Sequence, residues 1–165
     1  MTFAEIPAGA RVFIDANIFI YHFGGQSGEC RTLLERSARR EVVGYTSTMI
    51  LAEVLHRLMV AEAIQKGLVV AKGAVRKLAE KPEFVKQLNA YNENVKTIYE
   101  MNIVVSNLTL QILNSSQAIR ETEGLLTNDS LVIATMRDLS ITYLASADSN
   151  FEKVAGIELC APNDL

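Results

Sequence analysis

Four acidic residues lie inside or beside apolar segments of the sequence, whereas most other acids stand in charged runs such as residues 80–83. They are Asp15, Glu53, Asp129 and Asp148. A carboxylate among apolar neighbours costs free energy unless it has a partner. If all four converge, each ionised pair about 6 Å apart costs on the order of 3 kcal/mol at an effective dielectric constant of about 20. A bound cation would offset this repulsion.

The residue types favour one class of cation. Carboxylate oxygens suit Mg²⁺ or Mn²⁺, whereas zinc sites usually contain His or Cys. The chain has only two histidines, His22 and His56, and we expect neither to be a ligand. A divalent ion held by carboxylates can activate water and neutralise charge on a phosphodiester. The chemistry we expect is therefore metal-dependent hydrolysis of a phosphodiester bond.

The elements that must position these acids alternate between strands and helices. Short apolar runs predict strands at 12–14, 41–46, 103–105, 141–145 and 157–160. Helical spacing predicts helices at 27–40, from Ser47 to about 65, from 108 to about 124, and from about 128. This alternation predicts an α/β fold with a mostly parallel sheet flanked by helices. Ligands of such sheets bind beyond the carboxyl ends of the strands, where Asp15 and Asp148 fall.

The length of 165 residues predicts a single domain over residues 1–165. We find no internal repeat and no linker that would divide it. Residues 67–100 form a charged, helix-prone stretch that Pro82 interrupts, so we expect a helical elaboration of two helices there.

Composition excludes several classes of protein. The hydrophobic fraction of 49% excludes a disordered chain. Sixteen basic residues against nineteen acidic ones give a net charge of −3, so bulk charge does not indicate a nucleic-acid binder. No run is long and apolar enough for a membrane span, and the start does not resemble a signal peptide, so we expect a cytoplasmic protein. Cys30 and Cys160 are expected to be buried thiols.

Four segments together resemble the PIN-domain family of metal-dependent nucleases. They are residues 13–21 around Asp15, residues 47–57 around Glu53, residues 127–135 around Asp129 and residues 144–151 around Asp148. The resemblance implies a three-layer sandwich with a short, mostly parallel sheet, and a ribonuclease dependent on Mg²⁺ or Mn²⁺. It implies catalytic and metal-binding roles for the four acids, with Asn17, Ser146 and Ser47 as supporting polar groups.

Many small relatives in this family are VapC-type toxins, so the resemblance also implies an RNA substrate, an antitoxin protein as partner, and a homodimer. Two features depart from the pattern. The 72–99 stretch is longer than in compact toxins, and Ser146 stands where Thr is commoner.

Each candidate residue also has a structural interpretation. Asp15 suits a turn, Asp148 a loop, and Asp129 a helix cap. Glu53 could pair with Arg57 one helical turn later. Other residues have such interpretations too: Asn17 could cap a helix instead of holding the Asp15 loop, and Ser47 is expected to be a helix cap rather than a catalytic group.

Two other functions stay open. The first is a catalytically silent PIN-like module that binds RNA or protein. The second is a phosphatase with Asp15 as nucleophile, although that class has a second Asp where this chain has Asn17.

Two basic clusters stand outside these motifs. Arg39-Arg40 and the group Lys72, Arg76 and Lys77 are expected to be solvated faces. As a hypothesis, they contact RNA phosphates, which would make binding dependent on salt.

Overall fold

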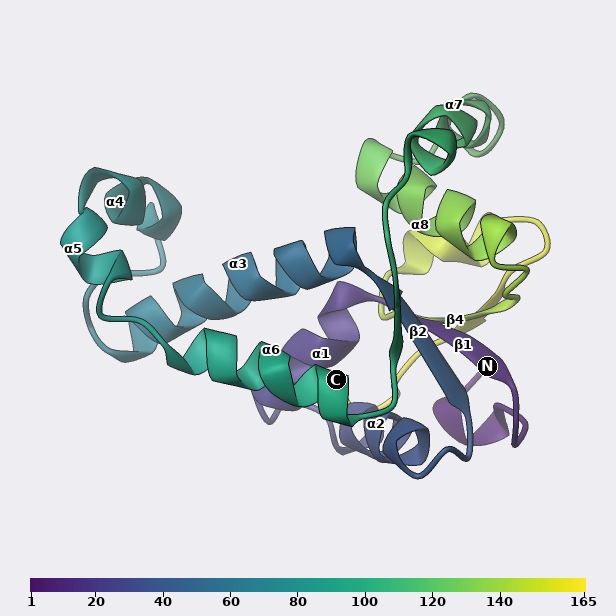
Figure 1. The fold of residues 1–165 in the computed structure, drawn as a ribbon, viewed down its shortest axis with the longest axis horizontal. Helices are drawn as coiled ribbons and strands as arrows, with labels where there is room; N and C mark the ends of the chain where they lie inside the picture. Colours follow the sequence, from purple (N-terminus) through teal and green to yellow (C-terminus); the bar gives the residue numbers. More distant parts are fainter.

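The computed structural model describes residues 1–165 as a five-stranded sheet flanked by helices (Figure 1). The strand order is β3-β2-β1-β4-β5, and every neighbouring pair is parallel. The α/β prediction is therefore confirmed. The strands are β1 (Arg11–Ile14), β2 (Val43–Ser47), β3 (Val104–Ser106), β4 (Tyr143–Ala145) and β5 (Glu158–Cys160).

Strand β1 forms the centre of the sheet and of the core. Val12, Phe13 and Ile14 are fully buried, as expected for a strand that is covered on both faces. The neighbouring strands β2 and β4 are in register with β1, so that Ile14 pairs with Ala145. The hydroxyl of Thr46 in β2 donates to the carbonyl of Ile14 at 3.0 Å. The carboxyl ends of three adjacent strands therefore lie side by side.

The helices α1, α2, α3 and α6 lie on one side of the sheet in Figure 1, and the pair α7 and α8 lies on the other. Two short 3₁₀ helices, η1 and η2, complete the chain. The bounds are η1 (Phe3–Glu5), α1 (Ala16–Phe23), α2 (Gly28–Ala38), α3 (Thr48–Gln65), α4 (Ala74–Glu80), α5 (Pro82–Val85), α6 (Ala90–Glu100), α7 (Leu110–Glu123), α8 (Thr127–Asp138) and η2 (Ser149–Lys153).

An arm formed by α3 and α6 projects from the sheet and carries α4 and α5 at its far end (Figure 1). We call residues 66–88 the arm tip. With Ala63 of α3 it forms a small apolar cluster, separate from the main core, whose other members are Val69, Ala74, Leu78 and Leu88. The prediction of two helices in this region was wrong, because the structure has three. Pro82 starts α5 at a position where a missing N–H costs nothing, and residues 86–89 then separate α5 from α6.

The sequence patterns missed helix α1 entirely. Its residues Ile18, Phe19 and Ile20 form a continuous apolar run with no alternation of polar and apolar residues, so the sequence shows no helical period. The structure explains the run, because consecutive residues Ile18 and Phe19 are both fully buried. Other boundaries moved by one or two residues: β2 begins at Val43 instead of 41, and α8 begins at Thr127 instead of 128.

Both cysteines are buried and unpaired, as predicted. None of the helices combines the length and the apolar character that crossing a membrane would need.

Candidate active site

Asp15 lies at the carboxyl end of the central strand and begins helix α1. Its backbone N–H still pairs with the carbonyl of Ala145 in β4, at 3.0 Å. Its Oδ1 accepts the N–H of Ala16 at 2.7 Å, which makes Asp15 the N-cap of α1. Its Oδ2 accepts two further bonds, from the Ser146 hydroxyl at 2.7 Å and from the Asn17 amide at 2.8 Å. The carboxylate is therefore held in one orientation.

Asn17 and Ser146 connect the loops that follow β1 and β4. The Asn17 amide nitrogen also reaches the Ser146 hydroxyl at 3.0 Å, and its oxygen accepts the N–H of Ala147 at 3.1 Å. Ser146 is fully buried, and its hydroxyl accepts the N–H of Asp148 at 3.1 Å. Of the two interpretations of Asn17, the structure thus favours the one in which it holds the Asp15 loop.

Asp148 begins the 3₁₀ helix η2. Its Oδ1 accepts the N–H of Asn150 at 2.9 Å, and its Oδ2 lies 3.4 Å from the Asn150 amide nitrogen. Asn150 was not among the residues predicted from the sequence. Asp side chains often accept the backbone N–H two residues later in a turn, so the position of Asn150 after Asp148 could have indicated this contact.

Asp129 lies in the first turn of α8, and Glu53 lies in the second turn of α3. Both acids line one hollow, together with Leu126, Thr127 and Asn128. Asp129 also lines a neighbouring hollow that includes Asn150. Asp129 does not cap α8, because Leu126 occupies the N-cap position and makes no capping bond. That structural interpretation of Asp129 was wrong.

Glu53 has one basic neighbour. Arg57 lies 3.8 Å away on the same helix, but its side chain is 60% exposed, so this contact contributes little. The predicted ion pair exists without neutralising the group of acids.

The charges of neighbouring acids act on two of the four carboxylates, Asp15 and Asp129. Burial raises the pKa of Asp15, hydrogen bonds from Ser146 and Ala16 oppose this, and the charges of Glu53 and Asp129 raise it further. Burial also raises the pKa of Asp129, and Asp148 and then Glu53 add to that effect. No Lys or Arg contributes to either shift. The structure therefore brings four acids from distant segments to one region, which we call the carboxylate centre, with no strong resident cation.

The donor chemistry of the carboxylate centre fits a hard divalent cation. All the groups present are oxygen donors, and the mutual repulsion of the acids is the cost that such an ion would offset. Glu53, Asp129 and Asp148 are near enough to raise the pKa of Asp15 or Asp129, but no three His, Cys, Asp or Glu side chains are grouped tightly enough to form a ready-made metal site.

Three other residues discussed above lie outside the hydrogen-bond network of the acids. Ser47 caps α3 by accepting the N–H of Ile50 at 3.3 Å, as expected, and bonds to none of the four acids. The ring of His22 packs against Phe23, and His56 is exposed on α3.

Comparison with known proteins identifies the family. Residues 12–157 match the model of the PIN domain, so the chain belongs to the PIN domain family. A curated relative, Ribonuclease VapC2 of Methanocaldococcus jannaschii, is 26% identical over 151 residues, which cover 90% of this chain and 92% of the relative.

Two solved structures share the fold. One is VapBC2 from Rickettsia felis bound to a DNA fragment from its promoter, with a TM-score of 0.59, 14% identity, and coverage of 93% of this chain and 99% of that chain. The other is a toxin–antitoxin complex from Klebsiella pneumoniae, with a TM-score of 0.55, 17% identity, and coverage of 89% and 95%. At these identities the likeness shows the fold.

Proposed function

We propose that this chain is a ribonuclease that depends on Mg²⁺ or Mn²⁺ and hydrolyses RNA phosphodiester bonds. The observation that carries the proposal is the carboxylate centre, where the charges of Glu53, Asp129 and Asp148 help to raise the pKa of Asp15 or Asp129 and no Lys or Arg opposes either shift. Membership of the PIN domain family and a relative named as a ribonuclease support it.

In this proposal the four acids hold the metal, which when bound would supply an activated water and positive charge beside the phosphate. The chain's own groups have separate tasks. Ser146 and Asn17 fix the Asp15 carboxylate by donating to its Oδ2. The bonds from Ala147 and Asp148 to the same pair keep the loop after β4 in place. One of the four acids would also accept a proton during the reaction.

The test compares the wild-type chain with Asp129→Asn on a mixed RNA pool, with Mg²⁺ or Mn²⁺ and with EDTA. Asp138→Asn is the matched control, because Asp138 ends the same helix α8. We expect cleavage by the wild type and by Asp138→Asn only with metal, and a loss of about 100-fold or more in Asp129→Asn. Cleavage that survives EDTA, or full activity of Asp129→Asn, would exclude the mechanism. RNA binding without turnover at saturating Mn²⁺ would indicate the catalytically silent module instead.

We further propose that the ribonuclease is the toxin of a toxin–antitoxin pair and forms a homodimer. The two solved complexes with this fold support an antitoxin partner. Expression of the wild-type chain should arrest growth, and Asp15→Asn should not. A small protein encoded next to the chain should relieve the arrest and copurify with it. Light scattering of the purified chain measures the oligomeric state, and a monomer would contradict the dimer.

A further inference from the structure

The arm tip carries a charge opposite to that of the rest of the chain. Residues 66–88 contain six Lys or Arg and two Glu, a net charge of +4. The remaining residues contain ten basic and seventeen acidic side chains, a net charge of −7, which together give the −3 of the whole chain. A short segment at the end of the arm is therefore the positive end of an acidic protein.

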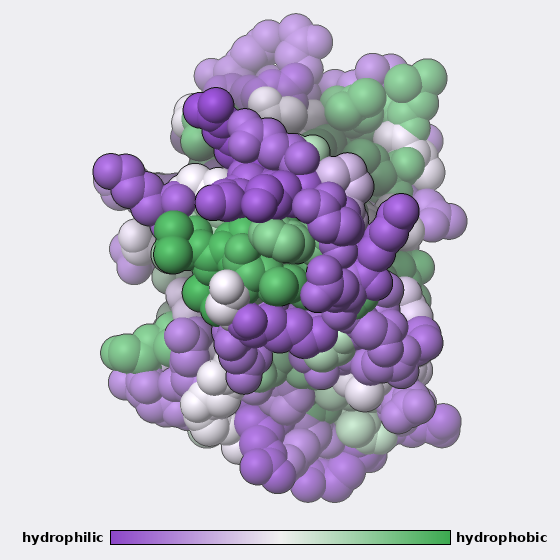
Figure 2. Space-filling view, turned by 90° about the vertical axis from the view of Figure 1, so that its left-hand side faces the viewer, coloured by the Kyte–Doolittle hydropathy of each residue, from purple (hydrophilic) through white to green (hydrophobic).

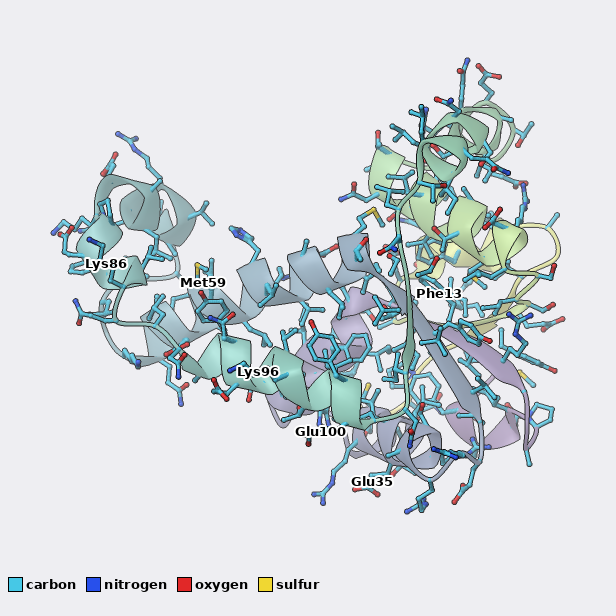
Figure 3. The ribbon with its side chains drawn as sticks, in the orientation of Figure 1. Phe13, Glu35, Met59, Lys86, Lys96 and Glu100 are labelled. Atoms are coloured by element: carbon cyan, nitrogen blue, oxygen red, sulfur yellow. The ribbon has the colours of Figure 1, made fainter.

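Four lysines at the arm tip are exposed and have no acidic partner within 4.0 Å: Lys72, Lys77, Lys81 and Lys86. The other two basic residues are paired, Lys66 with Glu62 and Arg76 with Glu80. Figure 3 shows Lys86 at this end of the molecule, far from Phe13 in the sheet. Seen from the arm end, hydrophilic side chains surround a central apolar area (Figure 2), and the exposed Val70 and Val75 belong to this segment.

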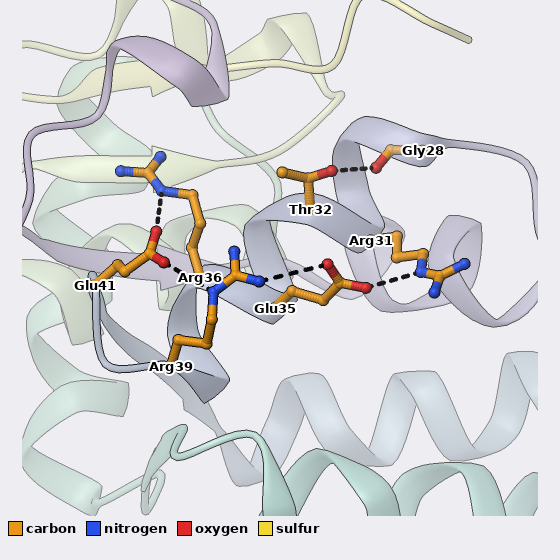
Figure 4. Close-up of polar contacts among 7 residues, drawn as sticks. All are labelled: Gly28, Arg31, Thr32, Glu35, Arg36, Arg39 and Glu41. Atoms are coloured by element: carbon orange, nitrogen blue, oxygen red, sulfur yellow. Dashed lines mark hydrogen bonds and ion pairs between the residues drawn. The ribbon is translucent and has the colours of Figure 1, made fainter.

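The basic residues in and just after helix α2 differ, because acids accompany all of them except the exposed Arg40. Glu35 lies between Arg31 and Arg39, at 2.9 and 3.9 Å, and Glu41 contacts Arg39 and Arg36 at 2.8 and 3.6 Å (Figure 4). Ion pairing leaves Arg39 with little free charge for a phosphate. Of the two basic clusters noted in the sequence, the one at the arm tip is the more available.

We propose that the arm tip binds the phosphate backbone of the RNA that is cleaved at the carboxylate centre, and this inference rests on the proposed function. The body of the chain is acidic and repels a polyanion, so a separate positive surface is needed to attract it. Helix α3 joins the two places, since Glu53 lies near its start and Gln65 ends it. Twelve residues of helix separate them by about 18 Å. The substrate is then a single strand long enough to reach from the cleaved bond to the arm tip.

The experiment measures RNA binding by fluorescence anisotropy in EDTA, where no cleavage occurs. It compares the wild type with a variant that combines Lys72→Gln, Lys77→Gln, Lys81→Gln and Lys86→Gln. A control variant combines Arg31→Gln and Arg39→Gln. Two single-stranded RNAs are used, of about 16 and about 4 nucleotides. On the longer RNA, the four-lysine variant should bind about tenfold or more weakly, and the slope of log K against log salt should fall by about 0.7 for each lysine.

The control variant should keep the wild-type affinity and slope on both RNAs. An unchanged slope in the four-lysine variant, or an equal loss in the control, would overturn the proposal. Loss of binding to an acidic antitoxin with RNA affinity intact would also overturn it, since the surface would then serve a protein partner.

If the combined variant does not fold, Lys77→Gln and Lys86→Gln are tested singly. Metal-dependent cleavage of the shorter RNA tests the nuclease activity independently.

Discussion

The hydroxyl of Ser146 donates a 2.7 Å hydrogen bond to Oδ2 of Asp15, between residues 131 positions apart. Ser146 is fully buried at the end of β4, and Asp15 follows β1, the neighbouring strand. A contact of this kind restricts the orientation of an acid whose own burial raises its pKa. It makes Ser146 a positioning residue in the proposed reaction.

Replacing Ser146 by Ala should therefore lower kcat by about 10- to 100-fold, the usual effect of losing a group that orients a metal ligand. RNA affinity in EDTA should be unchanged, because the hydroxyl points at Asp15 and not at the substrate. Ser146→Thr keeps the hydroxyl and should restore most of the activity. Steady-state kinetics with separate kcat and KM values measure this. A Thr variant as inactive as the Ala variant would indicate a packing role for this position.

Glu62 anchors the arm, because its carboxylate accepts the N–H groups of Asn89 and Tyr91 at 3.1 and 3.0 Å at the start of α6. Asn89 itself makes no side-chain cap. Glu62→Gln should lower the free energy of unfolding at pH 7 by about 1–2 kcal/mol, as the loss of a helix cap does.

The pH dependence of this effect follows from the pKa of Glu62. Burial alone would raise that pKa, but the bonds from Lys66 and from the backbone of Tyr91, Asn89 and Ala90 lower it to about 2, from an ordinary value of 4.5. The stabilisation is present in full above pH 4.5 and is lost as the pH falls toward 2. Denaturant unfolding at pH 7 and at pH 3 should show the difference between wild type and Glu62→Gln shrinking. A difference that grows on acidification would contradict this assignment.

Gly44 in β2 lies against helix α2 with no room for a side chain. A Cβ at this position would lie 2.6 Å from the Ser37 hydroxyl and 3.1 Å from both Ile103 and Ile14. Gly44→Ala should destabilise the fold by about 1–3 kcal/mol through overpacking.

Ser37 provides the matched control for Gly44. Its buried hydroxyl has no hydrogen-bond partner, so Ser37→Ala alone should be neutral or slightly stabilising. The double variant should be more stable than Gly44→Ala, because the closest contact is removed. Unfolding curves of the four chains form a double-mutant cycle. Strictly additive effects would show that Ser37 is not the group that Gly44 must avoid.

Leu126 is a poor residue for its position. It is the N-cap of α8, its backbone is extended, and its side chain is 76% exposed beside Asp129. Leu126→Ser should supply the missing cap and stabilise the fold by about 1 kcal/mol. At this chain length that raises Tm by about 2–4 °C. Leu126→Ala cannot cap the helix and should give no increase, so an equal rise in both variants would contradict the explanation.

The sequence allowed the sheet and its alternation with helices to be predicted because strand signals are local. Val12, Phe13 and Ile14 are apolar throughout, and a parallel strand covered on both faces requires this. Asp15 ends that run, so its place at the edge of the sheet was also predictable. Ser47 was predictable as a cap, because its role depends on Ile50 only three residues away.

The missing parts depend on contacts that no local pattern shows. Helix α1 was missed because its apolar residues are buried on more than one side, which hides the helical period. Glu62 pairs with Lys66 one helical turn later, but its carboxylate also caps a helix that begins 28 residues later, and no local spacing indicates that contact. The network among Asp15, Asn17 and Ser146 requires β1 and β4 to be neighbours, and strand order is a property of the whole chain.

The position of β4 beside β1 has a consequence for refolding. Ser146 holds the Asp15 carboxylate from 131 residues further along the sequence, and closing a loop of that length costs conformational entropy. Strands β1 and β4 must pair before this hydrogen bond can form. We therefore expect the final orientation of Asp15 to be reached late in refolding, after the local helices have formed.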